Sequence, residues 1–554
     1  MEEEIQAIRL KRGVGRMMNF RPIFTFALFL VAGVLYAYFR ILEGKNAYLL
    51  LFAALLLPLV ALCFARRKLR CAIYISIFYL AFALGNALFA WTVDDYRSQP
   101  KYAGEYTVEG TVVDKNYTDF GGEILLTNLT IDGNRQTDKM SVSVSEVDFG
   151  ALQHCDRVRM RLTVRSVNVL DGRYGFRAEA VADRQLYSGS LLTEYSVVGT
   201  DFKLGVFLRG ALQTTIAQSM EAEGAALLTA ILLGNTSGVE KGLLENIRYG
   251  GIAHIFAVSG LHIGSMFAAC LLLFRRRRIP APIRFLLSAF VLLFYGSICG
   301  YSSSVIRSIV TCLILYGCSL LGLKYDSLES LALAFTVVLF LYPTLLFGVG
   351  AQLSFAACLG ILLLSRPLRN MFERLFLSVD AFFRYRVFCK QKPEAVDMFR
   401  LNTLPTPLMR QWLSKAAAFL AVSLSAQIAT TPILYNSFGY FSVVSILLNC
   451  IFVPLISAGF APLLAVTAVA TCFSPTVSAV IMYLPDLALH VSVLPFHVWE
   501  LSSGILRGDP ITAEAIILYY GAVFLASDKL NVPKWYRRAL VLLYLLAFVL
   551  AVAL

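Results

Sequence analysis

The sequence predicts a polytopic α-helical membrane protein with a β domain inserted near its N-terminal end. Hydrophobic residues make up 58% of the 554 residues and charged residues only 15%, whereas soluble domains are about 45–50% apolar and about 25% charged. One soluble core cannot absorb this surplus, because single cores stop growing at about 250–300 residues. Residues 94–200 stand apart, since they have ordinary polarity and short alternating patterns. A soluble enzyme, a disordered chain and a small secreted scaffold are therefore excluded.

Residues 1–93 predict an N-terminal membrane segment of three helices. Apolar runs over 22–42, 48–65 and 71–92 are each long enough to cross a hydrocarbon layer of about 30 Å. No small-residue cleavage site follows the first run, so we expect it to be retained as a helix. Basic residues mark the cytoplasmic side of a membrane protein, and here they flank the first two runs: Arg9, Lys11, Arg12, Arg16 and residues 66–70. We therefore expect a cytoplasmic N-terminus and an extracytoplasmic segment from residue 94.

Residues 94–200 predict an extracytoplasmic β domain. Short runs with period-2 alternation are separated by Gly, Asn and Asp, as in strands joined by turns. They cover 106–113, 123–131, 140–147, 157–164 and 176–182. Five short strands favour a small closed barrel, and we expect an OB-like one.

The fourth of these strands carries an arginine stripe. Arg157, Arg159, Arg161 and Arg165 alternate with apolar residues, so on a pleated strand the arginines face outward. The stripe is typical either of a face that contacts DNA phosphates or of an ordinary solvated face. Acidic residues slightly outnumber basic ones over the whole domain, so only the local stripe favours nucleic acid.

The rest of the chain predicts an interfacial helix followed by membrane helices. Residues 201–222 form an amphipathic pattern, with Phe202, Leu204, Phe207, Leu208 and Leu212 on one side and Lys203, Arg209 and Gln213 on the other. The main membrane domain is expected over 223–500 and the last helices over 501–554. The whole chain then has about thirteen helices, some of them broken or re-entrant.

Two further stretches of the membrane domain have distinct expectations. Residues 443–472 are long enough to be broken at Pro454 or Pro462. Residues 366–410 are basic, rich in aromatics and too charged to span. We expect this stretch to be an amphipathic helix on the cytoplasmic face that docks a protein partner or binds anionic lipid.

The stretch GGIAHIFAVSGLHIG, residues 250–264, places polar groups at membrane depth. It holds two histidines, one serine and four glycines. Buried polar groups in a membrane face a cavity or a partner, and glycines allow a helix to break. His254 and Ser259 lie about 140° apart on a regular helix. We therefore expect a broken or re-entrant segment here.

Several interpretations of this stretch remain open. Ser259 as a nucleophile with His254 as its base lacks an acidic orienting residue nearby. A metal site built from His254 and His262 lacks a third ligand. Polar lining of a water-filled path and structural helix packing are the two other interpretations.

Further polar residues lie at membrane depth, and Arg307 is the most costly of them. An arginine at the centre of a spanning helix costs about 2.5–3.5 kcal/mol on insertion scales. It should therefore face the bundle interior, a pore or an anionic group, bond a helix end, or reach the outer interface. The full set of candidate channel-lining residues is His254, Ser259, Gly260, His262, Arg307, Gln352, Ser354, Gln427 and Asn449.

Common catalytic and metal motifs are missing from the sequence. There is no GxxxxGK[ST] loop, and the five histidines form neither HxH nor HExxH. The 11 cysteines are irregularly spaced and form no CxxC pair, which is typical of buried thiols and not of a disulfide framework. We expect no catalytic residue, no metal and no cofactor in this chain.

The stretch 250–264 resembles the signature of the ComEC/Rec2 family of competence proteins. Four other stretches resemble the same family in the same order: 227–239 (LLTAILLGNTSGV), 303–308 (SSVIRS), 350–361 (GAQLSFAACLGI) and 427–455. The family's architecture of three helices, an external OB-like domain and a competence membrane domain also agrees with the predicted organisation.

The resemblance implies a multi-pass protein of the bacterial inner membrane that takes up single-stranded DNA in natural transformation. About nine phosphates would lie within the membrane at once, so a wet, polar-lined conduit is required. Without an ATP-binding loop, we expect a separate cytoplasmic ATPase or helicase to pull the strand. An extracytoplasmic DNA receptor and membrane lipids are the other expected partners.

The sequence departs from the family in two places. Asn235 stands where the family often has an aspartate. Many members also carry a C-terminal metallo-β-lactamase-like domain, but this sequence ends at Leu554 within a helix, so we expect a separate nuclease or none. A transporter of a small or lipid-like anion and an intramembrane hydrolase using Ser259 and His254 are the alternative functions.

Overall fold

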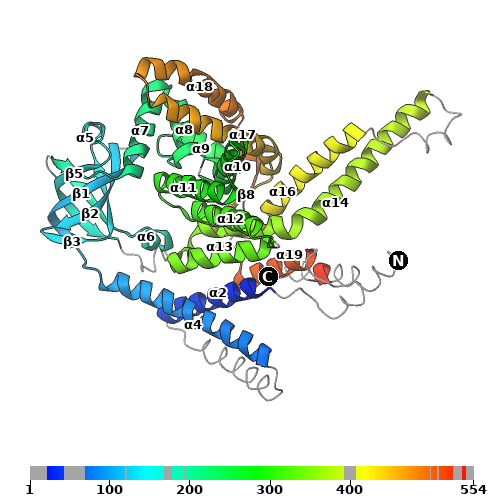
Figure 1. Cartoon of the computed structure of the whole chain (residues 1–554), viewed down its shortest axis with the longest axis horizontal. Coiled ribbons are helices and arrows are strands. Elements are labelled where there is room, and N and C mark those ends of the chain that lie inside the picture. The colour runs from blue at the N-terminus through cyan, green and yellow to red at the C-terminus, as the bar shows by residue number, and fades with distance from the viewer. Residues whose placement is uncertain are drawn as a thin grey trace.

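The computed structural model describes most of the chain: residues 21–42, 69–118, 121–167, 177–192, 195–256, 258–323, 325–391, 407–499, 501–507, 511–527 and 540–543. These residues form a largely helical protein with one sheet domain at its side (Figure 1). Seven helices of this part are long and apolar enough to cross a membrane. The membrane-protein class is thus supported, whereas the predicted helix over 48–65 lies outside the described residues.

The N-terminal segment contains two closely packed helices, α2 (Pro22–Leu42) and α4 (Leu69–Ser98). A β-carbon at Gly33 would lie 2.1 Å from the Phe82 carbonyl oxygen, and one at Gly85 would lie 2.2 Å from that of Leu30. Glycines thus let the two backbones touch, as is common between membrane helices. The first and third predicted helices are present, and α4 leads directly into the sheet domain.

The sheet domain is built from five strands whose pairings return to the first strand. The strands are β1 (Ala103–Thr118), β2 (Gly121–Ile131), β4 (Lys139–Val144), β5 (Asp156–Ser166) and β6 (Gln185–Leu191). The order is β1-β2-β4-β6-β5, and β5 also pairs with β1. Only the β4–β6 pairing in this cycle is parallel. Two short strands, β3 (Asn134–Gln136) and β7 (Ser196–Thr200), add to β2 and β5.

Four predicted strands are present, but the prediction over 176–182 is wrong. The chain forms a short helix, α6 (Ala178–Ala182), and the fifth strand of the cycle is β6. Alanine favours helix, which explains α6. The strand instead contains Tyr187, which is buried in the domain core and donates its hydroxyl to the Pro100 carbonyl over 3.1 Å. Burial of this ring selects the later segment for the sheet.

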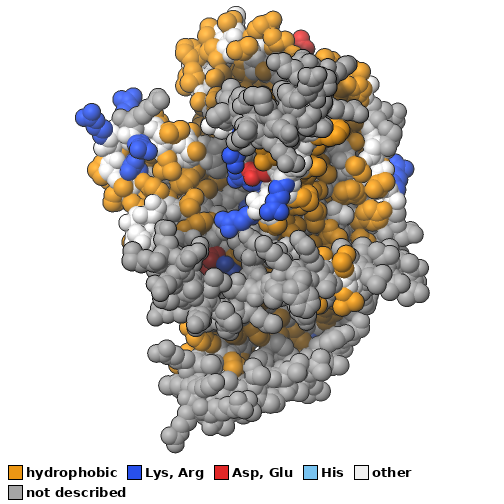
Figure 2. All heavy atoms as spheres, turned by 90° about the vertical axis from the view of Figure 1, so that its right-hand side faces the viewer, with side chains coloured by type: hydrophobic (Ala, Val, Ile, Leu, Met, Phe, Trp, Pro, Cys, Tyr) orange, Lys and Arg blue, Asp and Glu red, His pale blue; other side chains and the backbone are white. Residues whose placement is uncertain are grey.

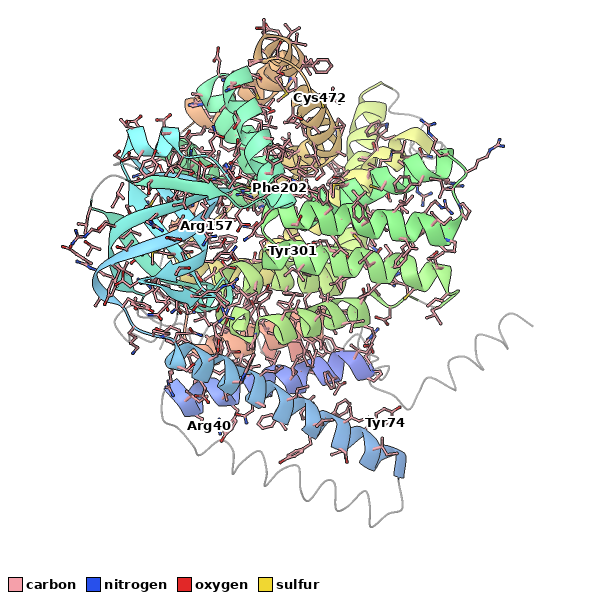
Figure 3. The ribbon with its side chains drawn as sticks, turned by 60° about the vertical axis from the view of Figure 1, so that its left-hand side comes forward. Arg40, Tyr74, Arg157, Phe202, Tyr301 and Cys472 are labelled. Atoms are coloured by element: carbon pink, nitrogen blue, oxygen red, sulfur yellow. The ribbon has the colours of Figure 1, made fainter. Side chains whose placement is uncertain are left out.

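The assignment of Arg209 to the polar, solvent-facing side of the interfacial helix is wrong. The helix is α7 (Leu204–Ser219), yet Arg209 is buried while Phe202 and Phe207 are 66% and 48% exposed. Figure 3 shows Phe202 and Tyr301 where the sheet domain meets the helices. Hydrophobic periodicity alone assigned Arg209 to the polar side. In the fold, its guanidinium donates hydrogen bonds to protein oxygens in place of water.

The membrane domain surrounds a large apolar core. Its elements are α8 (Ala222–Leu233), α9 (Lys241–Tyr249), η1 (Ala253–Ile255), α10 (Gly260–Arg276), α11 (Ala281–Cys299), α12 (Ser303–Leu320), α13 (Ser327–Leu341), η2 (Pro343–Phe347), α14 (Val349–Gln391), α16 (Pro407–Phe438), β8 (Tyr440–Ser442), α17 (Ser445–Ala470), α18 (Pro475–Val498), η3 (Leu501–Gly504), β9 (Ile505–Arg507) and α19 (Ala513–Ala526). The break expected at Pro454 or Pro462 is absent, because α17 runs continuously through both prolines.

Helices α14 and α16 form an arm that extends beyond the other helices (Figure 1). With 43 residues, α14 is about 65 Å long, roughly twice the thickness of a hydrocarbon layer. Arg369 and Glu373 on α14 both bond the Ser414 hydroxyl on α16. The surface helix expected over 366–410 is therefore corrected at both ends, to the continuation of α14 up to Gln391 and the start of α16 at Pro407, and 392–406 lie outside the described residues. Seen from the arm's end, Lys and Arg side chains gather among hydrophobic ones (Figure 2).

Candidate anion-binding site

The chain between α9 and α10 breaks where the sequence predicted a break. Gly251 has a φ of +68°, and a β-carbon there would lie 2.3 Å from the β-carbon of Ser445. Both the backbone conformation and the close approach favour glycine at this position. After η1, the chain reaches Ser259 and starts α10 at Gly260. The helix thus begins inside the bundle, where its first backbone N–H groups have no carbonyl partner in a preceding helical turn.

Arg307 is buried on α12 among neutral partners. Only 9% of the residue's surface is exposed. The Nε atom donates to the Ser354 hydroxyl over 2.9 Å, and Nη1 donates to the Cys358 sulfur over 2.9 Å. The guanidinium also lies 5.8 Å from the centre of the Phe355 ring. Over the described ranges, no aspartate or glutamate forms an ion pair with Arg307.

Gly260 brings the start of α10 against this guanidinium. A β-carbon at Gly260 would lie 2.6 Å from Arg307 Nη2 and 2.7 Å from the Ser308 hydroxyl. On the other side, the Ser304 hydroxyl donates to the Ser354 hydroxyl over 3.0 Å. Helices α10, α12 and α14 therefore meet close to their N-terminal ends, with Arg307 between them.

The electrostatics of this meeting point favour an anion. Helix N-termini carry a partial positive charge and expose backbone N–H groups. A guanidinium at the same place adds a full positive charge, and burial makes the lack of a counter-ion costly. Hydroxyls of Ser304, Ser308 and Ser354 supply further polar atoms. The arrangement is chemically suited to a phosphate or another oxyanion.

His262 and Ser259 support the start of α10. The His262 Nδ1 atom accepts the backbone N–H of Ser259 over 3.3 Å. The His262 residue is 1% exposed, and its ring stacks on Phe460 of α17 with a centroid separation of 4.3 Å. This bond engages the backbone of Ser259 and not its hydroxyl. His254 lies on η1 with an exposed side chain.

The other candidate residues lie in neighbouring clusters. Gln427 donates to the Ser442 carbonyl over 2.7 Å and accepts from the Ser445 hydroxyl, so it fixes the start of α17 beside Gly251. Asn449 lies one turn later, and its Oδ1 atom is buried without a hydrogen-bond partner. Gln352 bonds the Leu346 carbonyl over 2.9 Å. Gly260, Arg307 and Ser354 therefore come together around the guanidinium, and the Ser259–His262 bond lies at the start of the same helix.

The described part of the chain offers no cluster of metal ligands. In that part, no group of three or more His, Cys, Asp or Glu side chains is arranged to hold a metal ion. The polar atoms around Arg307 are hydroxyls, a thiol and guanidinium nitrogens. Such a set is chemically suited to anions and not to divalent cations.

The arginine stripe of β5 has the predicted alternation. Its apolar residues are buried: Val158, Met160, Leu162 and Val164. Glu109 on β1 pairs with Arg159 and with Arg157, and Glu105 pairs with Arg161 over 3.1 Å. Carboxylates on the neighbouring strand therefore neutralise much of the stripe, a pairing that strand periodicity alone did not indicate.

Arg209 is a residue whose role the sequence did not reveal. It forms a two-pronged ion pair with Asp114 of β1, with N–O distances of 3.0 and 2.9 Å. Its Nη1 atom donates to the carbonyls of Leu233 and Ile298, near the ends of α8 and α11. Those carbonyls are otherwise unpaired at helix C-termini. One side chain therefore fastens the sheet domain to two helices of the membrane domain.

Neighbouring contacts strengthen this joint. Asn235 donates its side-chain amide to the Lys115 carbonyl over 2.9 Å, and the Ser237 hydroxyl accepts the Tyr117 N–H over 2.9 Å. An aspartate at position 235 would have no N–H to donate, so the amide suits this contact. Burial lowers the pKa of nearby His154 to about 4. The ring therefore stays neutral at physiological pH.

Comparisons with known proteins find one matching family and one similar curated protein. The family described as "Competence protein" matches residues 231–554. ComE operon protein 3 of Bacillus subtilis (strain 168) is similar over 232 residues at 25% identity. That match covers 42% of this chain and 25% of the relative's length. No solved structure matches the chain.

Proposed function

Because the chain belongs to the competence protein family, which supports a role in DNA uptake, we propose that it is the channel through which single-stranded DNA crosses the bacterial cytoplasmic membrane. The observation that carries this proposal is the buried Arg307 between the N-terminal ends of three helices, without a carboxylate partner among the described residues. A DNA phosphate supplies the missing negative charge. One such contact attracts a strand without clamping it, which suits a moving polymer.

The proposed topology places this site in the outer half of the membrane. With a cytoplasmic N-terminus, α4 leads outward to the sheet domain and α10 leads inward to the basic residues 275–278. Alternation then makes α12 and α14 run inward, so Arg307 and Ser354 lie one to two turns below the outer surface. The arm formed by α14 and α16 projects into the cytoplasm.

The sheet domain receives the strand in this proposal. Its cyclic strand order, with a parallel β4–β6 pair, supports an OB-like barrel, a fold used for oligonucleotide binding. The proposed phosphate contacts are Arg157, Arg159, Arg161 and Arg165. Glu109 competes with DNA for Arg157 and Arg159, and Glu105 competes for Arg161. The Arg209 joint holds the domain directly above the entry.

The channel opens by separation of α10, α12 and α14. His262 and Arg307 are buried in the structure, so a strand reaches Arg307 only when these helices part. Gln352, Gln427, Asn449, His254 and Ser259 are then proposed as lining or supporting groups along the same route. A separate cytoplasmic ATPase or helicase supplies the force that pulls the strand, and an extracytoplasmic receptor delivers the strand. The chain itself catalyses no reaction in this proposal.

Substitution of Arg307 tests this function. In a transformable bacterium that depends on this chain, Arg307→Gln should lower uptake of labelled DNA about tenfold or more, because an anion contact of 1.5–3 kcal/mol is lost. Arg307→Lys keeps the charge and should retain part of the uptake. Normal uptake by Arg307→Gln at wild-type protein levels would overturn the proposal. Loss of small-anion flux with normal DNA uptake would favour the small-anion transporter.

A further inference from the structure

An apolar cavity lies between the N-terminal helix α2 and the membrane domain, and Phe355, which contacts the Arg307 guanidinium, forms part of its wall. Its volume is about 600 Å³. Its walls come from α2, α13, η2, α14, α16 and α19, six elements spread over the whole chain. Helices α2, α14 and α16 are among those that can cross a membrane, so the cavity lies at hydrocarbon depth.

The lining is almost entirely hydrocarbon. Only two of its described side chains, Gln352 and Tyr520, carry polar groups. Gln352 donates to the Leu346 carbonyl, and the Tyr520 hydroxyl donates to the Ala429 carbonyl over 2.8 Å. Both groups are thus already paired within the protein. Water needs two to four polar partners to occupy a cavity, and this one offers it few.

The size of the cavity argues against its being empty. An engineered cavity of about 150 Å³ already stays dry and takes up apolar molecules, and the present one is several times larger. The space is partly open to its surroundings, so molecules of the surrounding medium can enter it. A polyanion is equally excluded by the lining. The surrounding solvent at this depth is lipid, whose tails match the lining chemically.

We propose that this cavity binds an acyl chain of a membrane phospholipid. The acyl chain fills the space between the N-terminal helix α2, the central helices and α19. It therefore contacts three parts of the protein that lie far apart in sequence. At the starts of α2 and α13, which both line the cavity, Arg21 pairs with Asp326 over 3.1 Å and Glu329 accepts the Phe24 N–H. The inference does not depend on DNA passing Arg307.

Native mass spectrometry of the full-length protein tests this site. Wild-type protein released from detergent should retain one phospholipid per chain after extensive washing. Ala356→Phe and Ala429→Leu fill the cavity from α14 and from α16, and each should lower lipid occupancy about tenfold. Val480→Phe is the matched control, since Val480 is 75% exposed on α18 and does not line the cavity.

Two outcomes would overturn the inference. One is wild-type protein without retained phospholipid, and the other is equal lipid retention by wild-type and both filled variants. A variant that misfolds is recognised by loss of a monodisperse peak in gel filtration, and the remaining variant then decides. A photoreactive residue in place of Leu331 should crosslink to lipid. Crosslinks to the protein's own peptides alone would show that the protein fills the cavity itself, and this result would also overturn the inference.

Discussion

Gly260 and Arg307 touch across the interface between α10 and α12, where a β-carbon at position 260 would lie 2.6 Å from Arg307 Nη2. Gly260→Ala must therefore displace the guanidinium or the helix. Displacement weakens the proposed contact between the guanidinium and DNA phosphate, so we expect DNA uptake to fall about tenfold. The measurement is uptake of labelled DNA at matched protein levels.

Gly264→Ala is the control for this substitution. Gly264 lies one turn further along α10, and a β-carbon there would meet no atom within 4 Å. Uptake should stay at the wild-type level. Equal loss in both variants would show that the helix tolerates no alanine, and that the Arg307 contact is not the cause.

Arg209→Ala should loosen the sheet domain from the membrane domain. The substitution leaves the partly exposed Asp114 and two helix-end carbonyls without their donor, which costs about 1–3 kcal/mol. The apparent Tm of purified protein should fall, and the linker near α7 should become more sensitive to protease. Arg161→Ala is the control, because its pair with Glu105 is exposed on both sides and contributes about 0–1 kcal/mol. A Tm unchanged by Arg209→Ala would contradict the role of the joint.

His154 should make the sheet domain less stable in mild acid. Its pKa is about 4 in the fold and 6.5 in the unfolded chain, so only the unfolded chain binds a proton between these values. Stability is therefore unaffected by His154 above pH 6.5 and falls as the pH drops towards 4. Between pH 7.5 and 5 the loss is up to about 2 kcal/mol.

Thermal unfolding of wild-type protein and of His154→Gln at both pH values measures this effect. The wild type should lose more stability than the variant on acidification. The same loss in both proteins would assign the acid sensitivity to other groups.

Glu109→Gln should strengthen DNA binding by the sheet domain if the β5 stripe contacts phosphates. The substitution removes the carboxylate that pairs with Arg157 and Arg159. Each newly engaged arginine should steepen the salt dependence of single-strand binding by about 0.7 in log–log slope. Glu146→Gln, on the exposed start of α5 (Glu146–Ala151), is the control. Unchanged affinity and slope in Glu109→Gln would place the DNA contact elsewhere.

Much of the fold follows from patterns that are local in sequence. Long apolar runs predicted α2 and α4, and period-2 alternation predicted β5 with its buried and exposed faces. The glycines and polar residues of 250–264 predicted the break before α10. These features depend on neighbours within one turn or one strand, which a sequence displays directly.

Features that depend on distant partners were missed or misplaced. Arg209 was assigned to a polar helix face because its partner Asp114 lies 95 residues away. The charges of 366–410 indicated a surface helix, whereas Arg369 and Glu373 of α14 bond Ser414 of α16 across the arm. The partner of Arg307 on α14 is 47 residues distant, so the sequence marked the arginine as unusual without showing what surrounds it.

Crosslinking of a strand halted in transit is the most direct test of the claim that DNA passes the Arg307 site. A single strand carrying 4-thiothymidine and a bulky group at its trailing end would stall inside the protein and react with adjacent residues under ultraviolet light. The account predicts adducts on α12 and α14 near Arg307 and Ser354, weakened by Arg307→Gln. Adducts confined to the sheet domain or to the lipid-exposed surface, while unblocked strands still enter the cell, would contradict it.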